Sequence, residues 1–197
     1  SFNSFGHELN KNSDGYTEVV EVELSKKDIH QKINEWIALN YKSAQDVIQL
    51  NTEDKIVLKG NYTFTSTISG NTFGIRNTTT ISIRDNKYKI DLIPTSAFNK
   101  STMKDTEYAF ITQYMNNEVP TFDEFKPWHK NNTIKIWLSQ GYSERQVQKF
   151  AKKHITPDSQ KELFEKRLKT FENWNKAIES TFKSIKDYVS KSDDDDW

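Results

Sequence analysis

The C-terminal third of the chain contains a long segment that lacks any residue able to break a helix. Thr156 can cap a helix and Pro157 suits the first helical position, and neither proline nor glycine follows before Lys191. At a rise of about 1.5 Å per residue, this segment predicts a helix roughly 50 Å long. Any fold proposed for the chain must accommodate an element of that length.

Apolar side chains recur along this segment at a seven-residue spacing. One register contains Phe164, Phe171, Ile178 and Ile185, and the second contains Leu168, Asn175, Phe182 and Val189. Such a seam is typical of a coiled coil, in which one polar residue, here Asn175, fixes the register. Two interpretations stay open: this face packs on the sheet of its own chain, or it contacts another chain, either a protein partner or a second copy. In the second case, the candidate partner-binding residues are Phe164, Phe171, Asn175, Ile178, Phe182 and Ile185.

The segment after residue 15 begins with a strand and a helix. In Thr17–Leu24, alternate positions place the apolar residues Val20, Val22 and Leu24 on one face, which predicts a half-buried strand. Ser25 can then cap an amphipathic helix of about four turns, from Lys26 to near Asn40.

Four or five strands follow this helix. The strand patterns cover Asp46–Leu50, Lys55–Thr65, Asn71–Arg76, Thr78–Arg84 and Lys87–Ile93. Asp85 and Asn86 both tolerate a positive φ and predict a two-residue hairpin turn, and Pro94 is expected to end the last strand. The fold class predicted from this order is α+β, built on an antiparallel sheet.

The rest of the chain divides less clearly. Residues 107–141 have no regular period, whereas Ser143–His154 predicts a helix with Val147, Phe150 and Ala151 facing inward. The expected organisation is a flexible segment 1–15, an α+β domain 16–93, a linker and irregular packed segment 94–142, C-terminal helices 143–191 and an acidic tail 192–197.

Composition excludes several classes of function. The 28 basic residues balance the 28 acidic ones, so we expect no nucleic-acid partner. The chain contains no cysteine, which removes disulfide frameworks and thiolate zinc sites. No run approaches the roughly 18 apolar residues of a membrane span, although this leaves membrane association undecided.

Residue patterns that would indicate catalysis are also missing. None of His7, His30, His129 and His154 has a metal-ligand spacing, and no serine lies in a nucleophile-elbow motif. We therefore expect no catalytic residue, metal or cofactor. The alternative is a domain that binds or hydrolyses a small ligand, with a site between the sheet and residues 107–141. Its candidate residues are Tyr114, Trp128, His129 and Trp137.

Several sequence runs within residues 16–93 resemble a known family. They are TEVVEVEL, the run SKKDIHQKINEWIALNYKS around Trp36, the run QDVIQLNTEDKIVLKGNYTF around Gly60, and ISIRDNKYKIDL. The shared pattern is a strand, a helix with a tryptophan four residues before its end, a strand, a Lys-Gly turn and a hairpin that contains aspartate. These runs resemble a domain of unknown function with a TATA-box-binding-protein-like fold, found in secreted and envelope proteins of Bacteroidetes.

The resemblance covers about 40% of the chain and contains no catalytic motif. It implies a curved antiparallel sheet backed by helices, and a location in the periplasm, at the outer membrane or outside the cell. With the heptad seam, it leads us to expect a non-enzymatic binding or scaffolding protein that acts through protein–protein contacts. The fold name suggests DNA binding, but residues 16–93 contain ten basic and ten acidic residues, and fold similarity does not transfer function.

Overall fold

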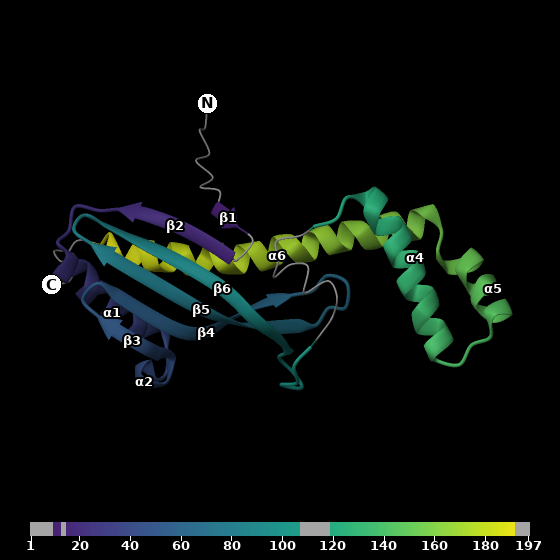
Figure 1. Cartoon of the computed structure of the whole chain (residues 1–197), viewed down its shortest axis with the longest axis horizontal. Helices are drawn as coiled ribbons and strands as arrows, with labels where there is room; N and C mark the ends of the chain where they lie inside the picture. Colours follow the sequence, from purple (N-terminus) through teal and green to yellow (C-terminus); the bar gives the residue numbers. More distant parts are fainter. Residues whose placement is uncertain (1–9, 13–14, 107–118, 192–197) are drawn as a thin grey trace, which may run out of the picture.

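Six antiparallel strands form one sheet in the part of the chain that this computed structural model describes, residues 10–12, 15–106 and 119–191. Their order across the sheet is β1-β2-β6-β5-β4-β3, and β5 and β6 form its long centre (Figure 1). The strands are β1 Asn10–Asn12, β2 Gly15–Glu21, β3 Ile48–Thr52, β4 Lys55–Thr65, β5 Thr72–Arg84 and β6 Lys87–Asn99. The predicted α+β class is confirmed.

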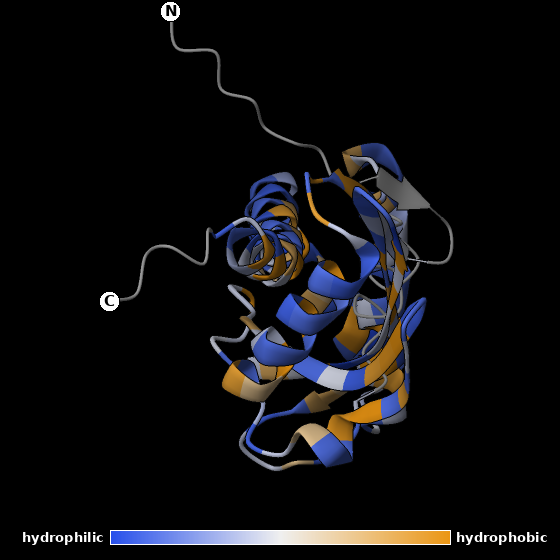
Figure 2. Ribbon diagram, turned by 90° about the vertical axis from the view of Figure 1, so that its left-hand side faces the viewer, coloured by the Kyte–Doolittle hydropathy of each residue, from blue (hydrophilic) through white to orange (hydrophobic). Residues whose placement is uncertain are grey.

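Two helices cover one face of this sheet, a short third helix contacts β3 and β4, and two others lie beyond the end of the sheet. The helices are α1 Lys26–Asn40, α2 Ala44–Val47, α4 Phe122–Ser139, α5 Glu144–His154 and α6 Pro157–Val189. Figure 2 shows α1 and α6 on the same side of the sheet. The pair α4 and α5 forms a hairpin at the N-terminal end of α6, away from the strands (Figure 1).

Local sequence signals explain most element boundaries. Ser25 caps α1 by accepting a hydrogen bond from the backbone N–H of Asp28, as its spacing predicts. Asn86 has a φ of 63°, which the two-residue turn between β5 and β6 requires. Thr156 caps α6, and Pro157 starts it. The predicted bounds of α1 and β4 match those of the structure.

Two predictions about the strands are wrong. Pro94 does not end β6, which continues to Asn99, and β5 is one strand where two were expected. The first error reflects a bulge at which Asn77 pairs with Pro94 while the preceding Arg76 pairs with Ser96. A bulge accepts proline within a sheet because the ladder is already interrupted there. The second arises because two inward positions of β5 are polar, Asn77 and Thr79, and interrupt the apolar alternation.

Two further segments differ from expectation. Asp46 and Val47 belong to the short helix α2, so the strand expected there begins only at Ile48. The segment 94–142, expected to be a linker and irregular, contains the end of β6 and the 18-residue helix α4. Its apolar residues show no clear stripe because the hairpin buries few of them, and Pro127 in the first turns further obscured the pattern.

The heptad face of α6 packs against its own chain. Ile178, Phe182 and Ile185 are at most 1% exposed and lie in the core formed with α1 and the sheet. Phe171 packs at the edge of this core. Of the two interpretations, contact with the chain's own sheet is the one that the structure adopts. The three buried side chains are not available to a partner, which corrects the prediction of a partner-binding seam at these positions.

Polar contacts fix the position of α6 on β2. The indole N–H of Trp174 donates to the hydroxyl of Tyr16 at 2.8 Å, and this hydroxyl donates to the side-chain oxygen of Asn175 at 3.1 Å. Lys186 forms an ion pair with Glu18 at 2.6 Å. Asn175, expected to set a coiled-coil register, thus contributes to the register of the helix on the sheet instead. Burial raises the pKa of Tyr16 far above its ordinary value, so its hydroxyl stays protonated as a donor.

A pair of truncations on α6 tests this packing. We expect Ile178→Ala to lower the free energy of unfolding by about 2–5 kcal/mol, because it leaves a cavity in the core. Leu168→Ala is the matched control: its side chain is 36% exposed on the same helix, and we expect a loss below about 1 kcal/mol. Chemical denaturation measures both values. Equal losses would contradict the packing described for α6.

The α4–α5 hairpin joins α6 through an aromatic junction around Arg167. This guanidinium is buried, and its Cζ lies 4.7 Å from the ring centre of Trp128 and 5.6 Å from that of Phe125. Phe164 packs against Phe125 with ring centres 5.3 Å apart. The ring of His129 stacks on Phe125. Burial, and then the positive charge of Arg167, lower the pKa of His129 below its ordinary value.

This junction predicts a loss of stability in mild acid. The lowered pKa means that His129 takes up a proton less readily in the folded state than in the unfolded chain, which binds it as the pH falls below about 6.5. The contribution of His129 is therefore present above that pH and is lost progressively below it. Urea denaturation at a series of pH values should show a flatter pH dependence for His129→Gln than for the unsubstituted protein. The same slope in both proteins would contradict the assignment.

Candidate functional site

The sheet face opposite α1 and α6 is an uncovered surface of the described chain. No described helix packs on it (Figure 2), and Val19 and Ile93 on this face are 59% and 45% exposed. The alternation of side chains along each strand divides the sheet into a covered face and an open face. Ile81, Ile83 and Ile90 point to the core, so their neighbours along β5 and β6 must point outward.

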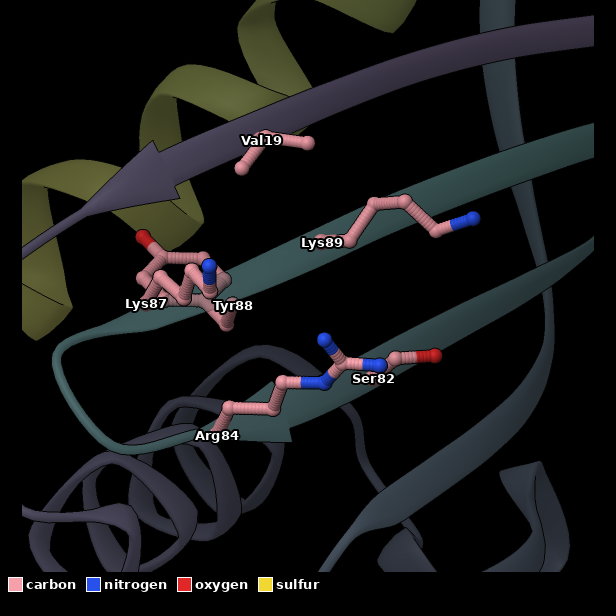
Figure 3. A pocket seen from close by; sticks show the side chains of 6 residues that line it. All are labelled: Val19, Ser82, Arg84, Lys87, Tyr88 and Lys89. Atoms are coloured by element: carbon pink, nitrogen blue, oxygen red, sulfur yellow. The ribbon is translucent and has the colours of Figure 1, made fainter.

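A hollow of about 400 Å³ lies on this open face, where β2, β6 and β5 run side by side (Figure 3). Its lining residues are Val19, Ser82, Arg84, Lys87, Tyr88 and Lys89. Pairing register brings them together: Val19 lies opposite Lys89, which lies opposite Ser82 on the other side. Three of these six residues are cationic, and none is acidic.

Acidic side chains border the hollow on two sides. Lys89 forms an ion pair with Asp91 at 2.8 Å, and the hydroxyl of Thr17 donates to the same carboxylate at 2.7 Å. Glu21 lies directly opposite Lys87 in the β2–β6 pairing. The hydroxyl of Tyr88 belongs to the covered side, where burial raises the pKa of this residue far above its ordinary value.

A second uncovered surface is the groove between α4 and α5. This groove has a volume of about 450 Å³, and its apolar floor comes from Ile134 and Leu138 of α4 and from Val147 and Ala151 of α5. Lys130, Glu144, Gln148 and Lys152 form its polar border. Leu138 is 41% exposed at the edge of this groove.

The structure disperses the six residues proposed for partner binding on α6. Ile178, Phe182 and Ile185 lie in the core, Asn175 binds Tyr16, and Phe171 packs beside the core. Phe164 belongs to the junction with α4, where its ring centre is 5.3 Å from that of Phe122. These residues therefore form no common surface.

The residues of the alternative ligand site are only partly brought together. Trp128 and His129 lie at the junction around Arg167, but Trp137 lies farther along α4 and packs on Phe150 of α5. Tyr114 lies outside the described residues. A ligand-binding or hydrolytic site in this region stays a prediction.

Sequence reasoning missed both uncovered surfaces. Alternation along β5 and β6 could have placed Ser82, Arg84, Lys87 and Lys89 on one face, since all four follow the outward positions of the predicted hairpin. The α4–α5 groove could not be predicted in a similar way, because the sequence pattern did not identify α4 as a helix.

The described residues contain no group of three or more histidine, cysteine or acidic side chains placed to hold a metal ion. In the same part of the chain, every helix is too short or too polar to cross a membrane.

Comparison with known proteins agrees with the geometry of the sheet and its helices. A crystal structure of a TBP-like protein from Parabacteroides distasonis is similar over 93% of this chain and 97% of its own, with 16% sequence identity and a TM-score of 0.52. At this identity, the similarity shows the fold alone. A DUF4468 family protein from Bacteroides ovatus matches 83% of this chain and 90% of its own, at 10% identity and a TM-score of 0.40. No curated protein matches the chain.

The family model of the domain of unknown function DUF4468, described as having a TBP-like fold, matches residues 16–94. These residues contain β2, α1, the hairpin strands and most of the covered core, and the match agrees with the resemblance inferred from their sequence runs. Residues 16–94 of this chain are therefore similar to DUF4468, the domain of unknown function with TBP-like fold.

Proposed function

We propose that this chain is a non-enzymatic binding protein of the bacterial cell envelope, and that the groove between α4 and α5 receives an acidic amphipathic helix of a protein partner. The observation that carries this proposal is the apolar lining of the groove, in which Leu138 is 41% exposed and Ile134 and Ala151 are half-buried, while Val147 is buried.

The shape of the groove fits a helix. Lys130, Ile134 and Leu138 recur at four-residue intervals on α4, and Val147 and Ala151 do the same on α5. Two such stripes on antiparallel helices form the floor on which a third helix packs in a bundle. A hairpin of two helices buries only the contact between them, so a third helix from a partner can pack on this floor.

The net positive charge of the α4–α5 hairpin favours an acidic partner. Residues 122–154 contain seven basic and three acidic side chains, so they carry a net positive charge. An acidic helix is attracted to this surface, whereas the same hairpin from a second copy is repelled. Charge complementarity therefore favours a different protein over self-association through this surface.

The proposed location in the envelope rests on the resemblance of residues 16–94 to domains of envelope proteins. The similar structures come from Parabacteroides distasonis and Bacteroides ovatus, which agrees with a bacterial source. Cell fractionation of the source bacterium, followed by immunoblotting of the full chain, tests the location. Recovery in the cytoplasmic fraction alone would contradict it.

A designed peptide tests the groove. The probe is a labelled amphipathic helix with leucine at positions i, i+3, i+4 and i+7 and glutamate on both flanks, measured by fluorescence anisotropy. We expect Leu138→Ser to weaken its binding by about tenfold or more, because burial of a leucine stabilises a complex by roughly 1.5–3 kcal/mol. Ile136→Ser is the matched control, since Ile136 is 46% exposed on α4 and does not line the groove.

Charge reversal supplies the second arm of this test. We expect Lys130→Glu combined with Lys152→Glu to weaken binding more than Lys135→Glu combined with Lys153→Glu, which lie on the same helices outside the groove. A peptide with lysine in place of glutamate should bind most weakly. Equal binding of both peptides, or equal effects of Leu138→Ser and Ile136→Ser, would overturn the proposal.

A further inference from the structure

We propose that the hollow on the open face of the sheet binds a phosphate group, held by Arg84, Lys87 and Ser82. This inference concerns the opposite end of the molecule from the α4–α5 groove and does not depend on the function proposed for that groove.

The pairing of β5 with β6 places two positive charges opposite each other. Arg84 and Lys87 are cross-strand partners that flank the hairpin turn, and both side chains are exposed on the open face. Like charges in this arrangement destabilise a sheet. Within the described chain, neither forms an ion pair of 4.0 Å or less, although Glu21 lies opposite Lys87 on β2. An anion between the two cations removes the repulsion.

The donors of the hollow match the acceptors of a phosphate. Figure 3 shows the guanidinium of Arg84 beside Ser82 on the same strand, with Lys87 and Lys89 on the neighbouring strand. A guanidinium forms paired hydrogen bonds with oxyanions, and the ammonium of Lys87 and the hydroxyl of Ser82 add further donors. Val19 supplies an apolar wall.

Charge balance favours a dianion over a single carboxylate. Lys89 is paired with Asp91, whereas Arg84 and Lys87 form no ion pair of 4.0 Å or less within the described chain, with Glu21 opposite Lys87 on the border of the hollow. A phosphate group carries a charge of about −1.5 to −2 at neutral pH, whereas a carboxylate carries −1. At about 400 Å³, the hollow also has room for an organic group beside the phosphate.

Titration of the full chain with inorganic phosphate, followed by NMR chemical shifts of the β5–β6 hairpin, tests this site. We expect saturable shifts centred on Ser82, Arg84 and Lys87. Arg84→Gln combined with Lys87→Gln should weaken binding at least about tenfold, because hydrogen bonds between charged groups are lost. The same double variant should unfold at the same or a higher temperature, since the repulsion between the two strands is removed.

The matched control is Lys27→Gln combined with Lys42→Gln, which removes the same charge at exposed positions on or next to α1. We expect this control to bind phosphate as the unsubstituted protein does. No saturable shift, or an equal loss of binding in the two double variants, would overturn the site and leave only general attraction between charges.

Two further ligands distinguish the source of the phosphate. Acetate should bind more weakly than inorganic phosphate, and equal affinity would contradict selection of a dianion. Flotation with phosphatidylcholine vesicles that contain phosphatidic acid tests a lipid headgroup. Binding to these vesicles that Arg84→Gln with Lys87→Gln abolishes would assign the site to a membrane surface, and phosphate binding without flotation would assign it to a soluble phosphate.

Discussion

Burial of the apolar face of α6 against the sheet is the contact on which the rest of the structure depends. Each 13-residue central strand spans about 43 Å, whereas the 15-residue α1 spans only about 22 Å. The first helix therefore cannot cover the sheet alone. At 33 residues, α6 runs nearly the full length of the strands and places Trp174, Ile178, Phe182 and Ile185 on the part that α1 leaves open.

This arrangement separates the residues that maintain the fold from those that can meet a ligand. The covered face combines apolar packing with a few satisfied polar contacts, such as that between Trp174 and Tyr16. Along β6, exposed charged side chains alternate with the buried core residues and point to the open face. Substitutions at Arg84 or Lys87 can therefore change binding while the core remains intact, which makes the two roles separable by experiment.

The sequence allowed good prediction where a local rule determines the structure. Ser25, Asn86 and Thr156 mark caps and turns, and the pattern of Lys55–Thr65 identified a strand with its bounds. The bulge at Asn77 was not predictable, because it depends on the pairing of two distant segments. The heptad pattern of α6 was ambiguous for a physical reason: an apolar stripe that packs on a sheet and one that packs on another helix have the same spacing. Neither candidate site was found: the hollow also needs Val19 of β2, which pairs with a distant segment, and the groove needs α4, which was not recognised as a helix.

The continuity of α6 has a consequence for how two ligands would act together. One end of the helix is embedded beneath the sheet, and the other holds the α4–α5 hairpin, with no proline or glycine between Asp158 and Val189. The two uncovered surfaces are thus held at a fixed separation rather than by a flexible tether. A ligand that spans both would meet a preorganised pair of sites and lose little linker entropy, whereas one of the wrong length would gain nothing from the second site.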